Sequence, residues 1–456
     1  MRKQFEKSIF VFVVCLSFFL GNILWAEDMK NSFVVSEPLV LHTLSPEITG
    51  SKYPTYESAE IFVDANDNII AVSSFKTDPN SGERKVLVSV FHNNDWITSS
   101  ATLTGYPQWH GMINNGAFEV YAIKIPQHND PVKVQTISIY NLTSGMKLSS
   151  QPTKIIKVDE TKKTFNQESY KIITQLLPLK GSLNKFFIVG YYVEYSLNPI
   201  DITHRIISAG HWGFVQRPFG AIVENGEIIG FYNTPDKFKT NDSTELIRSI
   251  VNDDTINTIW IQTRDYCTDP KIIKYSQFNL SDKSWAESEE LFRGYKREEI
   301  LSSNFFPPSM AYYKESLYCT WYWSLYDESS GRKITKEENG IYFCERINKQ
   351  WEKPVKIADS DNYTYSYIVV DNDGIVYVLW VGNEGLCCKV KTAAGWMETS
   401  LLVNDKKIKA WGGHDTLLGT AVDKNNNIHI LYIRKGKPQQ FMYVKLTPVT
   451  KTAETK

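Results

Sequence analysis

The stretch IFVDANDNIIAVSSF, residues 61–75, decides the fold of this chain. A short apolar strand runs into a turn rich in Asp and Asn, and a second apolar strand follows. Because Asn and Asp tolerate the positive φ that tight hairpins demand, the pattern predicts a β-hairpin. The pattern returns as YIVVDNDGIVYVLWV, residues 367–381, and as GTAVDKNNNIHILYI, residues 419–433. Weaker copies begin at Gly111, Leu176, Gly220, Ser249 and Ser309. The chain is therefore a series of repeated hairpins.

A polar turn that ends in Trp follows many of these hairpins and marks a third and a fourth strand. Such turns end at Trp96, Trp212, Trp285, Trp351 and Trp396, and in one unit Met146 takes the Trp position. A Trp at this place can pack its ring between neighbouring sheets. One small sheet cannot bury both of its faces, but sheets stacked around an axis can. We therefore predict a single all-β domain, a β-propeller over residues 33–446.

The last unit stops at its third strand, FMYVKL from Phe441, and FVVSEPLVL from Phe33 can supply the missing fourth strand. That closure ties the two ends of the domain together and removes free sheet edges. It predicts seven four-stranded blades. Counting hairpins gives eight as the alternative, although the copies at Gly220 and Ser249 lie too close together for two full blades. A double β-sandwich is the competing fold. Residues 447–456 are expected to form a polar tail.

The N-terminus has the pattern of an export signal. Arg2, Lys3 and Lys7 precede an apolar run over residues 9–25, and Ala26 stands before an acidic pair. Residues 1–26 are therefore predicted to be a signal peptide, with an uncleaved anchor as the alternative because the run is long. No later segment is apolar enough to span a membrane. The expected location is outside the cell, in the periplasm or at the cell envelope.

The composition argues against nucleic acid as a partner. Lys and Arg number 50, Asp and Glu 51, so no basic excess exists to neutralise a phosphate backbone. Removal of the signal would leave an odd number of cysteines. Cys319 and Cys344 lie in consecutive expected strands, and two interpretations stay open: a disulfide, or buried apolar thiols. We expect a monomer.

The repeats resemble the BNR or sialidase-like family of bacterial β-propellers. The resemblance rests on the hairpins and on turn endings such as SDKSW, residues 281–285, and AAGW, residues 393–396. It implies a propeller that engages a glycan at its central mouth. Sialidases also carry three arginines around the substrate carboxylate, and HRII, residues 204–207, resembles the first of their motifs but lacks its Pro.

Propeller geometry indicates where a ligand would bind. Loops that enter the first strand of each blade, and loops between second and third strands, meet at the central mouth. The candidate ligand-binding residues on these loops are aromatic, His or Arg: Tyr56, Trp109, His110, Arg217, Arg264, Tyr363, Tyr365, Trp411 and His414. The candidate catalytic residues are His110, His414, Arg217 and Tyr365. A histidine can act as a general base because its side chain titrates near neutral pH.

Three hypotheses follow. The first is a lectin-like glycan-binding propeller, the second a glycoside hydrolase or polysaccharide lyase on the same fold, and the third a protein-interaction scaffold with an exposed apolar patch. No cofactor is expected. The Asp-rich turns at residues 64–68 and 423–427 lack the loop length and closing acid of a calcium loop, so we interpret them as turns and expect no metal.

Overall fold

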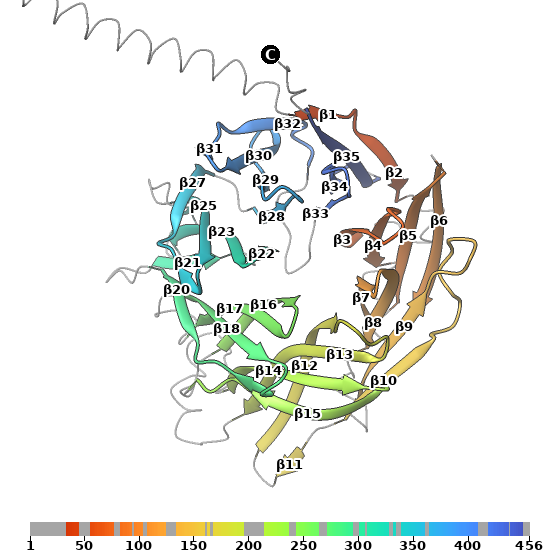
Figure 1. Cartoon of the computed structure of the whole chain (residues 1–456), viewed down its shortest axis with the longest axis vertical. Helices are drawn as coiled ribbons and strands as arrows, with labels where there is room; N and C mark the ends of the chain where they lie inside the picture. Colours follow the sequence, from red (N-terminus) through yellow and green to blue (C-terminus); the bar gives the residue numbers. More distant parts are fainter. Residues whose placement is uncertain are drawn as a thin grey trace, which may run out of the picture.

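The computed structural model describes residues 33–44, 55–76, 83–93, 95–103, 107–124, 134–159, 162–164, 167–195, 214–236, 243–263, 271–294, 301–305, 308–327, 332–333, 339–360, 364–408, 418–436 and 438–449. The regular elements in these residues are all strands, paired antiparallel and arranged as a seven-bladed β-propeller (Figure 1). The predicted fold class and blade number are confirmed. The same residues contain no helix long and apolar enough to cross a membrane.

The first two blades are plain four-stranded sheets. Blade 1 consists of β3 (Thr55–Val63), β4 (Ile69–Lys76), β5 (Arg84–His92) and β6 (Asp95–Leu103). Blade 2 consists of β7 (Pro107–Asn114), β8 (Ala117–Lys124), β9 (Val134–Asn141) and β10 (Lys154–Asp159). In each blade the first strand is the innermost.

Blades 3 and 4 follow the same plan with added strands. Blade 3 consists of β11 (Lys162–Thr164), β12 (Gln167–Pro178), β13 (Lys185–Tyr195), β14 (Phe214–Glu224) and β15 (Glu227–Asn233), with β12 as the innermost long strand. Blade 4 consists of β16 (Ser243–Asn252), β17 (Thr255–Thr263), β18 (Ile272–Asn279), β19 (Ser284–Trp285) and β20 (Glu289–Arg293). The hairpin at Gly220 is therefore β14–β15, the outer half of blade 3, and this removes the eighth blade.

Blades 5 and 6 have a split outer strand. Blade 5 consists of β21 (Leu301–Phe305), β22 (Ser309–Tyr313), β23 (Ser316–Asp327), β24 (Arg332–Lys333), β25 (Gly340–Ile347), β26 (Gln350–Trp351) and β27 (Val355–Asp359). Blade 6 consists of β28 (Ser366–Val370), β29 (Val376–Val381), β30 (Gly385–Thr392), β31 (Gly395–Trp396) and β32 (Ser400–Asn404).

Blade 7 closes the ring with strands from both ends of the domain. It consists of β33 (Leu418–Val422), β34 (Ile428–Arg434), β35 (Gln440–Pro448), β1 (Phe33–Val35) and β2 (Leu39–Thr43), and β1 and β2 both pair with β35. The predicted closure by an N-terminal strand is thus present. The closing strand is broken into β1 and β2, with a register shift between Val40 and His42.

The Asp-rich turns form because one carboxylate satisfies several backbone donors. In blade 1, Asp64 Oδ1 accepts the backbone N–H groups of Asn66 and Asn68, each at 2.9 Å. The residue before the end of the turn, Asp67, has φ 66°, as such a turn requires. The same geometry recurs at Asp371 and Asp423. These residues act as turn formers, as the sequence predicted.

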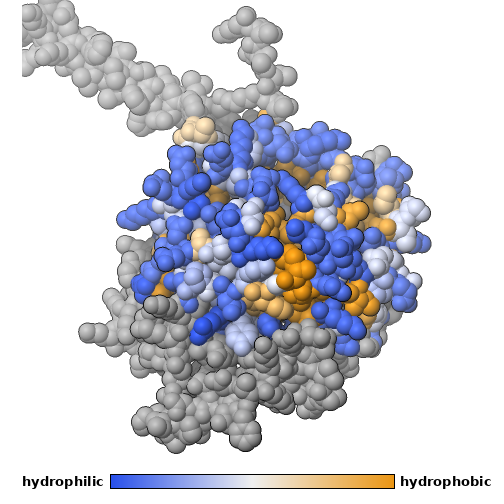
Figure 2. Space-filling view, turned by 60° about the horizontal axis from the view of Figure 1, so that its bottom comes forward, coloured by the Kyte–Doolittle hydropathy of each residue, from blue (hydrophilic) through white to orange (hydrophobic). Residues whose placement is uncertain are grey.

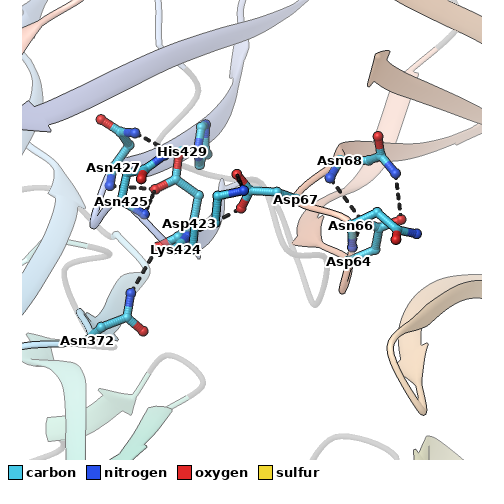
Figure 3. A network of polar contacts seen from close by, with 10 residues as sticks. All are labelled: Asp64, Asn66, Asp67, Asn68, Asn372, Asp423, Lys424, Asn425, Asn427 and His429. Carbon is cyan, nitrogen blue, oxygen red and sulfur yellow. Dashed lines mark hydrogen bonds and ion pairs between the residues drawn. The ribbon is translucent and has the colours of Figure 1, made fainter. Parts of the chain in front are cut away.

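The turns also bond to one another across blade boundaries (Figure 3). Asn372 donates from its side chain to the backbone carbonyl of Asp423 at 3.0 Å, which joins blades 6 and 7. The ammonium of Lys424 lies 3.3 Å from the carboxylate of Asp67, which joins blades 7 and 1. Blade 7 is therefore held at this end by turn contacts as well as by its N-terminal strands.

Among the described residues, buried apolar side chains form seven clusters, one at each junction between neighbouring blades. The Trp turns contribute to them as predicted. Trp285 donates from Nε1 to the backbone carbonyl of Tyr232 in blade 3 at 2.9 Å, and Trp96 packs edge-on against Tyr443 in blade 7. Burial between sheets is what stabilises the ring, since no blade covers its own faces. Trp212 lies outside the described residues.

The outer surface carries an apolar patch within a mostly hydrophilic face (Figure 2). That view brings forward the side with β10 and β15, which contact each other. Ile155 on β10 is 53% exposed, and Ile229 and Phe231 on β15 are also exposed. The hypothesis of a protein-interaction scaffold, which requires an exposed apolar patch, therefore stays a prediction.

Candidate functional site

The innermost strands β3, β7, β12, β16, β22, β28 and β33 surround the propeller axis (Figure 1), and each contacts its neighbour on both sides. Apart from the short pairing of β11 with the start of β12, the inward edges of these strands have no further strand among the described residues to pair with. Side chains from adjacent blades supply some of the missing hydrogen bonds. The polar residues gathered there in blades 1, 2 and 4 are Glu60, His110, Tyr121 and Arg248, which we call the hub cluster.

Glu60 and His110 form the centre of the hub cluster. Oε1 of Glu60 lies 2.8 Å from Nδ1 of His110, and Oε2 accepts the backbone N–H of Gly111 at 2.6 Å. The carboxylate of blade 1 therefore binds the innermost strand of blade 2 at two points. The side chains of Glu60 and His110 are 18% and 28% exposed, so both reach solvent.

This contact fixes the direction of the imidazole. A carboxylate accepts hydrogen bonds, so Nδ1 carries the proton that lies between His110 and Glu60. Nε2 is then the nitrogen that can accept a hydrogen bond or a proton from a ligand. The pair has the chemistry of an oriented general base.

The ring of Tyr121 packs against the imidazole of His110. Its ring centroid lies 5.4 Å from that of His110, and the backbone N–H of Leu176 donates to its hydroxyl at 3.2 Å. Burial raises the pKa of Tyr121, and the charge of Glu60 raises it further, while the Leu176 bond and the charge of Arg248 lower it. The phenol therefore stays protonated and serves as a neutral packing and hydrogen-bonding group.

Similar side-chain contacts join other innermost strands. Gln175 of blade 3 exchanges two hydrogen bonds of 2.9 Å with the backbone of Ser249 in blade 4. Ser309 of blade 5 accepts from the backbone N–H of Ile368 in blade 6 at 3.3 Å. Glu60, like Gln175, therefore bonds the backbone of the innermost strand in the next blade. It also orients His110. Among the described residues, no group of three His, Cys, Asp or Glu side chains could hold a metal ion.

Three of the predicted residues do not have the exposed loop positions that were expected. Trp109 lies within β7 and is 1% exposed, so its ring is part of the core between blades 1 and 2. Tyr365 is 7% exposed, against Tyr367. Arg217 lies on β14, the third strand of blade 3, and does not enter an innermost strand. Trp109 and Arg217 are therefore strand residues, whereas Tyr365 keeps its predicted loop position directly before β28 (Ser366–Val370) but is buried.

The other predicted residues are not placed beside His110. The backbone of Tyr56 belongs to β3, but its side chain is outside the described residues. Outside them altogether lie Arg264, Tyr363, Trp411 and His414. Their roles stay predictions.

Sequence reasoning missed Glu60, Tyr121 and Arg248 because it searched loops and not strands. A usable signal was present for the two charged residues. Glu60 stands in SAEIFV and Arg248 in LIRSIV, each the one charge within a short, largely apolar stretch. A charge in such a strand must find a partner or reach solvent.

Cys319 and Cys344 are directly opposite each other on β23 and β25, and both are free thiols buried in one apolar cluster. Burial raises the pKa of both, that of Cys344 to about 12. Both are free thiols in the structure, and the choice between a disulfide and buried thiols stays a prediction.

Seven antiparallel blades around a polar hub define the class of this protein as a β-propeller with an axial candidate site. No protein-family model and no curated protein sequence matches the chain. Solved structures of similar fold include an α-L-arabinanase of Penicillium chrysogenum complexed with arabinobiose, with 9% identity, 92% of this chain and 99% of that chain covered, and a TM-score of 0.44. The phage phi92 endosialidase has 12% identity, 93% and 70% coverage, and a TM-score of 0.43.

A third example is the β-propeller domain of the Trilobed protease from Pyrococcus furiosus, with 13% identity, 86% and 95% coverage, and a TM-score of 0.43. These likenesses concern the fold, and they transfer no residue role to this chain.

Proposed function

We propose that this protein is an exported carbohydrate-binding β-propeller whose glycan binds at the hub, with His110 as the main polar contact. The observation that carries the proposal is the Glu60–His110 pair. Its oriented imidazole is 28% exposed beside the axis, so it can reach a ligand there. Sugar hydroxyls both donate and accept hydrogen bonds, so a fixed acceptor at Nε2 suits them.

Glycan-panel binding and calorimetry on the exported domain test this proposal. The His110→Ala variant is expected to bind at least about tenfold more weakly, which corresponds to about 1.4 kcal/mol and to the loss of one good hydrogen bond. His92→Ala is the matched control, since His92 lies on β5 and also bonds through Nδ1, to Asn68 at 3.0 Å. Equal affinity of the His110 variant and the control would remove the hub from the proposal.

A second candidate is a glycan-active enzyme, and the acid–base character of the same pair favours it. The hub cluster offers one carboxylate and one imidazole. A base-catalysed elimination fits that set better than hydrolysis by two carboxylates.

Glu60→Gln separates binding from catalysis. The new amide keeps a carbonyl for the Gly111 N–H but presents an NH2 group to His110 Nδ1. Nδ1 must then accept, and Nε2 carries the proton. An enzyme with His110 as base is expected to lose about 10²–10⁴ in turnover and to change its pH profile. A binding protein shows no unsaturated or released sugar with either chain.

A further inference from the structure

Leu246 has a backbone conformation that its neighbours in the sheet do not share. Of the described non-glycine residues with positive φ, eleven lie in turns or bends, and Leu246, with φ 54°, lies inside a strand. A bulky side chain in the left-handed region is strained. Such strain persists where the surrounding structure enforces it, and it gathers at functional sites.

The strain belongs to a β-bulge on β16, the innermost strand of blade 4. Glu245 pairs with Ile261 and Arg248 pairs with Ile259, so two residues of β16 oppose one residue of β17. A bulge changes the direction of the side chains that follow it, and bulges are common next to binding sites. The first residue to resume the ladder pairing is Arg248.

Arg248 brings a positive charge to the hub cluster. Its side chain is half-buried, and Nη1 donates to the backbone carbonyl of Ile247 at 3.1 Å. The residue that follows it, Ser249, exchanges two hydrogen bonds with Gln175. The neighbour of Gln175, Leu176, donates to the hydroxyl of Tyr121, whose ring packs on His110. The charge of Arg248 lowers the pKa of Tyr121. Within the part of the chain that the structure describes, Arg248 has no carboxylate partner. A guanidinium can hold two oxygens of a carboxylate or of a sulfate by two hydrogen bonds.

We propose that the hub prefers glycans that carry an anionic group, a uronate carboxylate or a sulfate, and that Arg248 on the Leu246 bulge is the residue that determines this preference. The inference rests on the proposed function, because it names the ligand class of the same site. His110 contacts hydroxyls of the sugar, and Arg248 holds its charge.

The test compares oligogalacturonate with its fully methyl-esterified form, which has the same backbone without charge, and with a sulfated oligosaccharide. The natural chain is expected to bind a charged probe at least tenfold more tightly than the ester, and the stronger of the two charged probes identifies the source of the anion. Arg248→Gln is expected to lower the affinity for the charged probes to that for the ester, and so to abolish the preference. Arg248→Lys is expected to keep part of the preference for charged probes. Arg293→Gln, on the exposed outer strand β20, is the matched control.

Two further variants examine the bulge. Leu246→Gly relieves the strain without removing the bulge and is expected to keep the preference. Leu246→Val resists positive φ and is expected to weaken it, with folding checked by circular dichroism. Equal binding of charged and neutral probes by the natural chain, or an unchanged preference in Arg248→Gln, overturns this inference alone. Failure of every sugar to bind overturns the proposed function as well.

Discussion

Acid is expected to weaken the closing blade through His42. This residue lies on β2, where its Nε2 is 2.6 Å from the hydroxyl of Ser89 in blade 1 and its ring stacks on Phe441 of β35. Burial lowers the pKa of His42 from 6.5 to about 4. The unfolded chain therefore takes up a proton below pH 6.5, whereas the folded chain takes it up only near pH 4. Stability falls between these two values and is fully retained above them.

The magnitude follows from the separation of the two pKa values. Each unit is worth about 1.4 kcal/mol, so the full loss is about 3 kcal/mol, and at pH 5 it is about 2 kcal/mol. His42→Phe keeps the stacking on Phe441 and has no proton to gain. Ser89 retains a partner in Thr98 at 3.0 Å, so the substitution leaves no hydroxyl without a hydrogen bond.

Urea unfolding at pH 7.5, 6, 5 and 4.5 measures the effect. The free energy of unfolding of the natural chain minus that of His42→Phe should fall by about 2 kcal/mol from pH 7.5 to pH 5. Taking this difference cancels the contribution of His429, a second buried histidine whose pKa burial lowers. A difference that stays constant over this range would refute the reasoning, because it would mean that His42 takes up its proton equally in both states.

Two further predictions concern packing and turns. Gly190→Ala would place its Cβ 2.1 Å from the backbone oxygen of Ile172, so an overpacking cost of about 1–3 kcal/mol is expected in urea unfolding. Asp423→Ala should lower the free energy of unfolding by about 3 kcal/mol, and by more than Asp64→Ala does. The reason is that Asp423 bonds two backbone N–H groups and also the buried His429. Equal losses of thermal stability in the two variants would contradict this.

The sequence was most informative where structure is local. The turns at Asp64, Asp371 and Asp423 depend on side-chain bonds to residues two and four positions away, and their hairpins were predicted correctly. The hairpin at Gly220 carries the same local pattern, yet it forms the outer half of blade 3. Which blade this hairpin belongs to follows only from how the strands pair around the axis. That pairing joins residues that are far apart in the sequence.

The site was harder to predict because its residues meet across blades. Glu60 and His110 are fifty positions apart in the sequence. Arg248 belongs to yet another blade, blade 4. Trp109 illustrates the opposite error. It was placed in a loop, but β7 already begins at Pro107, so the strand directs the indole into the core. The expected strand began at Gly111, so an error of four residues at the strand boundary exchanged a binding position for a buried one.

Polar side chains at the axis of a propeller do not by themselves indicate a ligand, because the free edges of the innermost strands require partners. Gln175 is fully explained in this way: both ends of its amide bond the backbone of Ser249. Glu60 is explained in part, by its bond to Gly111. His110 is different, since its bond to Glu60 leaves Nε2 directed elsewhere and supports no strand edge. The residue whose hydrogen-bonding capacity exceeds what the fold requires is the one to substitute first.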